Sequence, residues 1–172
     1  MDNKTDLRTK AKAIRKTLDL PAISAELVAK LRAQDFYQNA KNIMIYYPKE
    51  DEINVLDLLS DDKNFYLPRV NGDLLHVCPY CTGDKLECST FKVMEPCSMP
   101  VESAILDLVI VPALMADKNN FRLGYGGGFY DRFLRAHPDV LSVVLIPHEL
   151  FIDNLPVENF DRPVKQVLLS EP

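Results

Sequence analysis

Residues 107–134 read DLVIVPALMADKNNFRLGYGGGFYDRFL, and this stretch decides the fold of the chain. Its apolar start predicts a buried strand at 105–111, which a polar loop, a glycine-rich turn and a helix from about Phe129 follow. Four of the six glycines lie within the five positions from Gly124 to Gly128. Glycine loses more backbone entropy on folding than other residues, so this cluster indicates that something approaches the backbone closely.

The glycine-rich turn is interpreted as a phosphate-binding site. Amides without neighbouring side chains, together with the first amides of the following helix, form a concave surface that attracts anions. Arg122 and Arg132 flank the turn with forked donors, and Asp131 places a carboxylate beside it. A carboxylate next to bound phosphate is best explained by a divalent cation between them. The alternative is a plain glycine turn with an acidic residue capping the helix.

Two common nucleotide-binding motifs do not match this turn. Gly128 is followed by Phe129 and Tyr130, whereas a Walker A loop ends in glycine, lysine and a hydroxyl residue. The spacing Gly124-x-Gly126-x-Gly128 also differs from the dinucleotide-binding fingerprint. The sequence therefore predicts a third kind of phosphate site.

The length and composition indicate one globular domain over residues 1–172. The chain has 47% apolar and 26% charged residues, which is ordinary for such a domain. The formal net charge of −5 argues against general nucleic-acid binding, which requires a large basic face. No apolar run reaches the roughly 18 residues of a membrane span, and the amino end lacks a secretory signal pattern. We expect a cytoplasmic protein with neither nucleic-acid nor membrane partners.

The four cysteines lie in one third of the chain, at positions 78, 81, 88 and 97. Cys78 and Cys81 have the two-residue spacing of zinc and redox sites. A second matched pair is absent from the sequence, so free cytosolic thiols are the first expectation. A zinc or redox interaction module built on these two cysteines is the less favoured alternative.

The order of the predicted elements indicates an α/β fold. Strand, helix and strand over 42–68 predict a parallel unit, whereas Asn71 and Gly72 predict an antiparallel hairpin. Residues 82–103 and 153–163 are interpreted as irregular loops. We expect a single-domain three-layer α/β/α fold with a mixed, mostly parallel sheet. The predicted strands are 42–47, 64–68, 73–80, 105–111, 140–146 and 166–169, and the predicted helices are 3–18, 21–33, 54–59 and 129–136.

The first predicted helix, over 3–18, is amphipathic and strongly basic. A solvated face is the usual meaning of such a basic pattern. In a chain that is acidic overall, however, the pattern indicates that positive charge is delivered to an anionic ligand. We therefore expect this helix to pack over the rim of the active site. The apolar residues are Leu7, Ala11, Ile14 and Leu18, and the basic ones include Lys4, Arg8, Lys12 and Arg15.

The candidate residues follow predicted strands at the point where each strand ends. Glu52 follows the strand that ends at Tyr47, the glycine-rich turn follows the strand that ends at Val111, and Asp161 follows the strand at 140–146. Either acid alone is more often a solvated loop residue. Open α/β sheets bind ligands at the carboxyl ends of their strands, so these loops are expected on one rim.

Residues 107–112 and 122–134 resemble the signature block of the 5-formyltetrahydrofolate cyclo-ligase family, also called methenyltetrahydrofolate synthetase. In order and spacing the resemblance covers nearly the whole chain. Weaker support comes from Lys4-x-x-Leu7-Arg8, Tyr47-Pro48 with Glu52, Pro68-Arg69-Val70, Glu95-Pro96, and Leu155-Pro156-Val157 leading to Asp161.

The resemblance implies an ATP-dependent ligase that needs Mg2+. Its substrate would be 5-formyltetrahydrofolate, with or without a polyglutamate tail, and its product 5,10-methenyltetrahydrofolate, with ADP and phosphate released. The formyl oxygen would take the γ-phosphoryl group before ring closure. Such chemistry relies on positioning and charge stabilisation. We expect the enzyme to act as a monomer.

The resemblance also assigns roles to individual residues. Lys4 and Arg8 would reach the ATP phosphates, Asp131 and Asp161 would hold Mg2+, and Glu52 would meet the folate. Arg122 and Arg132 would be catalytic. The segment that wraps ATP would comprise Arg122, Leu123, Gly124, Tyr125, Gly126, Gly127, Gly128, Phe129 and Tyr130, of which Tyr125 to Phe129 would also border the folate.

The sequence departs from the family pattern at four positions. Asn120 and Lys92 replace glycines, Leu150 stands where glutamine is frequent, and Phe160 replaces a polar neighbour of Asp161. Asn tolerates a positive φ better than most residues, so Asn120 is a mild change. The other three bear on folate contacts more than on ATP binding. A non-catalytic sensor of a sugar phosphate or nucleotide on the same fold is the alternative function.

Overall fold

The structure is a computed structural model that describes residues 2–172; Met1, which the single-domain expectation includes, lies outside the described residues. The α-helices are α1 (Lys4–Arg15), α2 (Leu20–Arg32), α3 (Asp35–Asn39) and α4 (Phe129–Ala136). The strands are β1 (Asn42–Met44), β2 (Asn64–Asn71), β3 (Leu74–Pro79), β4 (Leu86–Cys88), β5 (Met94–Pro96), β6 (Leu108–Ile110), β7 (Met115–Asp117), β8 (Arg122–Leu123), β9 (Leu141–Ile146), β10 (Phe151–Ile152) and β11 (Gln166–Leu169). Short 3-10 helices occupy Leu56–Ser60, Ser103–Ile105 and His148–Leu150.

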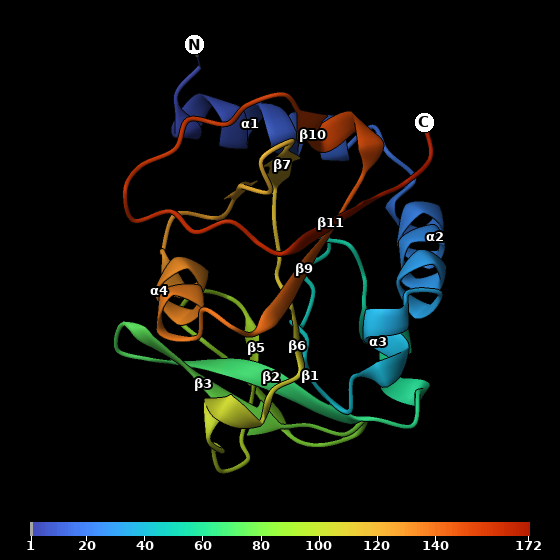
Figure 1. Cartoon of the computed structure of the whole chain (residues 1–172), viewed down its shortest axis with the longest axis vertical. Helices are drawn as coiled ribbons and strands as arrows, with labels where there is room; N and C mark the ends of the chain where they lie inside the picture. The colour runs from blue at the N-terminus through green and yellow to red at the C-terminus, as the bar shows by residue number, and fades with distance from the viewer. Residues whose placement is uncertain (1) are drawn as a thin grey trace.

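Across residues 2–172 the largest sheet has six strands in the order β11-β9-β6-β1-β2-β3. All neighbours are parallel except β2 and β3, which form the antiparallel hairpin expected from Asn71 and Gly72. The prediction of an α/β fold with a mixed, mostly parallel sheet is therefore confirmed. Figure 1 shows α4 on one side of strands β9, β6 and β1, and α2 and α3 on the other.

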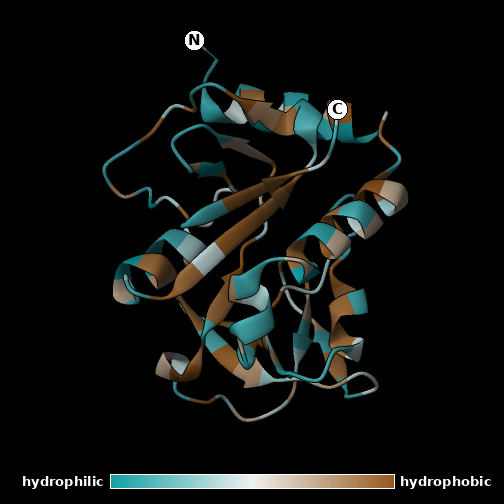
Figure 2. Ribbon diagram, turned by 45° about the vertical axis from the view of Figure 1, so that its right-hand side comes forward, coloured by the Kyte–Doolittle hydropathy of each residue, from teal (hydrophilic) through white to brown (hydrophobic). Residues whose placement is uncertain are grey.

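Alternate strand residues face two separate hydrophobic clusters. Met44 and Val109 join the cluster that contains the apolar faces of α1 and α4. Ile43 and Leu108 face the cluster formed with α2, α3 and the first 3-10 helix. Both faces of the parallel strands are thus covered, which requires the continuous apolar runs seen in the sequence. In Figure 2 these strands are brown along their length, whereas the outward sides of the helices are largely teal.

Helix α1 differs from its prediction at its end and on one face. The helix begins after Asn3, whose side chain accepts the Asp6 amide at 2.9 Å, and it ends at Arg15, before Leu18. Arg15 is only 2% exposed. It was expected on the basic face of the helix, but it follows the buried Ala11 by four positions and therefore lies on the buried face.

Several strands that depend on tertiary pairing differ from the prediction. Residues 82–103 contain the hairpin of β4 and β5, where an irregular loop was expected. The strand predicted at 105–111 is reduced to β6 after a 3-10 turn. The small sheet β10-β7-β8 was missed, because each of its strands has only two or three residues. Such short strands give almost no periodicity to detect.

Among residues 2–172, no helix combines the length and the apolar character needed to cross a membrane.

A polar cluster joins α2, α3 and the turn before β2. The Tyr37 hydroxyl donates to Asp61 at 2.6 Å, and the Arg32 Nε and Nη2 atoms donate to the same carboxylate at 3.0 and 2.9 Å. Burial opposes ionisation of Asp61, but these hydrogen bonds outweigh it and lower the pKa of its carboxyl group. The cluster therefore stabilises the layer of α2 and α3 when the Asp61 carboxyl group is ionised.

Asp61→Asn is expected to lower the free energy of unfolding at pH 7 by about 1.5–3 kcal/mol, because hydrogen bonds to a charged acceptor are lost. A carboxyl with a lowered folded-state pKa stabilises above its unfolded pKa of about 3.9. The difference between the two proteins should thus shrink as the pH falls below about 4. Urea denaturation across this range measures it. Asp57→Asn, which alters an exposed partner of the same Arg32, is the control and should change stability by less than about 1 kcal/mol.

Candidate active site

A cavity of about 620 Å³ opens at the carboxyl ends of β1 and β6. This volume lies within the range of small-molecule sites, and the position is the one that open α/β sheets use for ligands. Segments from seven parts of the chain surround the cavity. They contribute Lys4 and Arg8 from α1; Tyr46, Tyr47, Lys49 and Glu52 after β1; Pro68, Val70 and Leu75 from the β2–β3 hairpin; Ser89, Phe91, Val93 and Glu95 from the β4–β5 hairpin; and Pro112, Arg122 to Asp131, Phe160 and Asp161.

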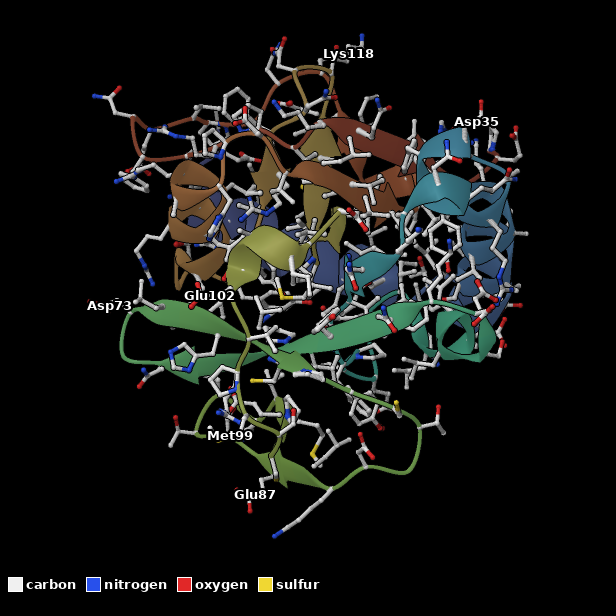
Figure 3. The ribbon with its side chains drawn as sticks, turned by 60° about the horizontal axis from the view of Figure 1, so that its bottom comes forward. Asp35, Asp73, Glu87, Met99, Glu102 and Lys118 are labelled. Atoms are coloured by element: carbon white, nitrogen blue, oxygen red, sulfur yellow. The ribbon has the colours of Figure 1, made fainter. Side chains whose placement is uncertain are left out.

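The structure brings nearly all of the predicted site residues to this one cavity; Arg132 is the exception. Its Nε atom donates to the Asp73 carbonyl at 2.7 Å, and its guanidinium lies 4.8 Å from the centre of the Phe129 ring. Figure 3 shows Asp73 at the tip of the β2–β3 hairpin, on the same side of the sheet as α4. Arg132 thus holds this hairpin against the start of α4, outside the cavity lining.

The glycine loop, defined as residues 124–128, has the backbone geometry of an anion site. Gly126 and Gly128 have φ values of 108° and 71°, which residues with side chains rarely adopt. Gly128 is the N-cap of α4, and no side chain caps the helix there. The first amides of α4 therefore face the cavity region without an internal acceptor, as in phosphate-binding helix starts.

Helix α1 reaches the glycine loop. The Arg8 Nε atom donates to the Gly124 carbonyl at 2.8 Å. A side chain at Gly126 would contact the same guanidinium at 3.6 Å. Lys4 reaches the other side of the cavity, where its Nζ atom lies 2.7 Å from Asp161. Positive groups from the first helix and amides from the second half of the chain thus share one cavity.

Arg122 is a buried cation in the wall of the cavity. Its side chain is 5% exposed, and its Nη1 atom donates to Asp131 at 3.1 Å and to the Arg162 carbonyl at 3.3 Å. The Nε atom is buried without an acceptor among residues 2–172. An unpaired buried donor is costly, so a donor left open beside a cavity is suited to bind a ligand.

Asp131 and Asp161 have the features of a magnesium site that is completed by phosphate. One oxygen of Asp131 accepts from Arg122 and from the Arg162 amide, and one oxygen of Asp161 accepts from Lys4 and from the Glu158 amide. The second oxygen of each accepts no hydrogen bond from the described residues. Within residues 2–172, no group of three or more acidic, His or Cys ligands is gathered. Mg2+ commonly uses one or two carboxylates with substrate phosphates and water, which this pair fits.

Glu52 is a buried carboxylate in the wall of the same cavity. It is 8% exposed and accepts the Lys49 amide at 2.9 Å. Burial raises the pKa of Glu52, although the Lys49 amide and the charge of Arg15 counteract part of this effect. Burial, reinforced by Glu52, also raises the pKa of Tyr125 and Tyr130, so both phenols stay protonated as donors near neutral pH.

Sequence reasoning missed the contribution of the β4–β5 hairpin to the cavity. The Phe91 and Phe129 rings meet edge to face with centroids 5.6 Å apart. Glu95 accepts the Val70 amide at 2.8 Å, which ties the hairpin to β2. The motifs Glu95-Pro96 and Pro68-Arg69-Val70 were the available signal, but their proximity depends on the tertiary fold.

Two of the departures from the family pattern lie at positive φ. Asn120 has φ 65° and Lys92 has φ 58°. Glycine avoids the steric penalty of this conformation, which explains its frequency at such positions. The Asn120 conformation agrees with the expectation from its tolerance of the left-handed region.

The cysteines do not form a recognisable site. All four, at positions 78, 81, 88 and 97, are free thiols within the described part of the chain. Cys78 is buried, and burial raises the pKa of its thiol, which disfavours the reactive thiolate. This geometry gives no support to a zinc or redox module.

Comparison with known proteins agrees with the geometry. The profile of the 5-formyltetrahydrofolate cyclo-ligase family matches residues 1–170. The chain is 30% identical over 146 residues to the 5-formyltetrahydrofolate cyclo-ligase of Haemophilus influenzae, covering 77% of this chain and 78% of that one. It is 28% identical to the mouse 5-formyltetrahydrofolate cyclo-ligase, covering 88% of each chain.

A solved structure gives the same result. The NMR structure of the 5,10-methenyltetrahydrofolate synthetase of Aquifex aeolicus superposes with a TM-score of 0.83 at 25% identity, covering 96% of this chain and 89% of the other. The Mycoplasma pneumoniae 5,10-methenyltetrahydrofolate synthetase, at 20% identity and a TM-score of 0.77, shares the fold. A buried cation beside a glycine loop, a buried carboxylate in the same cavity and a family match over residues 1–170 lead to one conclusion: the chain is a ligase of the 5-formyltetrahydrofolate cyclo-ligase family.

Proposed function

We propose that the enzyme closes the ring of 5-formyltetrahydrofolate to 5,10-methenyltetrahydrofolate with ATP and Mg2+, releasing ADP and phosphate. In this reaction the formyl oxygen attacks the γ-phosphorus and ADP leaves. Nitrogen N10 then attacks the activated formyl carbon and releases its proton to solvent, and phosphate departs with that oxygen. We expect the protein to act as a monomer in the cytoplasm on folate with or without a polyglutamate tail.

One observation carries the proposal: a single cavity joins a glycine loop with arginine donors to a buried carboxylate. The glycine loop and the arginine donors suit a triphosphate, and the buried carboxylate suits the N–H groups of a pterin. Phosphoryl transfer between two bound substrates needs both in one water-excluding space.

The phosphate side of the cavity would be formed by main-chain amides and cations. The glycine loop and the first turn of α4 would donate to the phosphates. Arg8 is already in contact with this loop, and the open Nε donor of Arg122 would bind a phosphate oxygen or the charge that develops on transfer. Arg132, placed outside the lining, would act by holding Phe129 in position.

Asp131 and Asp161 would hold Mg2+, through the carboxylate oxygens that their salt bridges leave open. When bound, the ion neutralises phosphate charge and favours departure of ADP. Lys4 pairs with Asp161 and Arg122 pairs with Asp131, and these ion pairs orient the two carboxylates.

The folate side would be formed by Glu52 and by the aromatic residues around it. A carboxylate accepts hydrogen bonds from the pterin N–H groups, and Tyr125 and Phe129 offer apolar surface that borders the ring. Phe91 and Phe129 lie edge to face and would cover the substrate from the side of the β4–β5 hairpin.

The purified protein, incubated with 5-formyltetrahydrofolate, ATP and Mg2+, should produce the absorbance of the methenyl product. Omission of ATP or of Mg2+ should abolish the signal. Binding of a sugar phosphate or nucleotide without product formation would contradict the proposal and support a non-catalytic sensor.

Arg122→Ala is expected to lower kcat/KM about 10²- to 10³-fold, because a preorganised donor to the transferring phosphoryl group is lost. Steady-state absorbance kinetics with a thermal melt separate this effect from unfolding. Lys118→Ala removes an exposed cation from the β7–β8 hairpin that also carries Arg122, and it should leave kcat/KM within twofold.

The acidic limb of kcat/KM for the folate should lie above the ordinary glutamate pKa of about 4.3, since burial raises the pKa of Glu52 and only its ionised form accepts the pterin hydrogens. A pH–rate profile at saturating Mg-ATP measures the limb. Glu52→Gln should lower kcat/KM and remove the limb; a limb that persists unchanged in this variant would assign it to another group.

A further inference from the structure

Arg15 is a buried cation that the proposed mechanism does not use. It is the last residue of α1 and is 2% exposed. Its Nη1 atom donates to the Asp51 carbonyl at 2.7 Å, and its Nη2 atom donates to the Ala113 carbonyl. Its Nε atom is buried with no acceptor among residues 2–172. Burying a guanidinium is expensive, so a neutral residue would be expected here if packing alone mattered.

The two carbonyls belong to two different segments that each contribute to the lining of the cavity. Asp51 directly precedes Glu52, in the turn where Glu52 accepts the Lys49 amide. Ala113 directly follows Pro112, which lines the cavity after β6. The planar fork of one guanidinium therefore sets the separation of these two segments.

We propose that Arg15 is a positioning residue that fixes the Glu52 turn for folate binding by clamping the Asp51 and Ala113 carbonyls. It touches neither substrate and acts through Glu52. This inference rests on the proposed function, in which Glu52 binds the pterin.

The charge of Arg15 adds a second effect on the same carboxylate. The ionisable groups around Glu52 are Lys49 and Asp51 in its own turn, Arg15 from α1, Tyr46 after β1, and Tyr125 and Tyr130 of the glycine loop and α4. Arg15 and Lys49 lower the pKa of Glu52, and Asp51 raises it. The positioning effect and the charge effect of Arg15 can be separated by substitution. A lysine at this position keeps the positive charge but cannot donate to both carbonyls with a rigid fork.

The test compares Arg15→Lys and Arg15→Met with the wild-type enzyme. We expect both to raise KM for 5-formyltetrahydrofolate on the order of 10- to 100-fold, as small displacements of a binding group do. KM for ATP should stay within twofold, because the Arg8 contact with the glycine loop is unchanged. Only Arg15→Met should move the acidic limb of kcat/KM to higher pH, since only it removes the charge. Loss of folded enzyme would instead lower kcat and leave both KM values unchanged, which would overturn the inference.

Hydrogen exchange gives a readout that does not depend on turnover. The Lys49 amide donates a hydrogen bond to Glu52, and its hydrogen should exchange at least tenfold faster in Arg15→Lys than in the wild-type enzyme. Arg32→Lys is the matched control, because Arg32 also donates to a backbone carbonyl, that of Asp57, from a helix. It should leave both KM values and the Lys49 exchange unchanged. Unchanged Lys49 exchange in Arg15→Lys overturns the clamp, whereas absence of product from the wild-type enzyme overturns the proposed function.

Discussion

Helix α1 ties together the loops that surround the cavity, because three of its basic side chains bind different loops. Lys4 pairs with Asp161, Arg8 donates to the glycine loop, and Arg15 donates to the carbonyls of two further segments. Successive residues of this set lie four and seven positions apart, so one helix can contact several loops along its length. The remaining geometry of the site depends on this helix being docked.

The charges of the cavity are arranged in pairs that leave selected atoms open. Arg122 uses Nη1 on Asp131 and keeps Nε unpaired, and Asp131 and Asp161 each keep one oxygen that accepts no hydrogen bond from the described residues. Pairing makes burial of the charges tolerable, while the open atoms retain affinity for a charged ligand. Glu52 is different, because the charges of Arg15 and Lys49 offset the effect of burial only partly, and burial dominates its pKa. The cavity thus combines anion-binding donors with a buried hydrogen-bond acceptor.

Much of the site could be predicted because its residues are close in sequence or follow strand ends. The cluster from Gly124 to Gly128 signals its own backbone conformation, and α4 and β11 have their predicted bounds. Arg132 was assigned to the same site by proximity in sequence. A helix turns by about 100° per residue, so its neighbour Asp131 faces the cavity while Arg132 reaches the Asp73 carbonyl.

By itself, the sequence determined the α/β class, the parallel strands with one hairpin, the glycine loop and the family to which the chain belongs. These features depend on local propensity, hydrophobic period and motif spacing, which are properties of neighbouring residues. Only the tertiary structure decided that Arg15 is buried as a clamp and that the β4–β5 hairpin lines the cavity. Both depend on contacts between segments tens of residues apart, which no local pattern encodes.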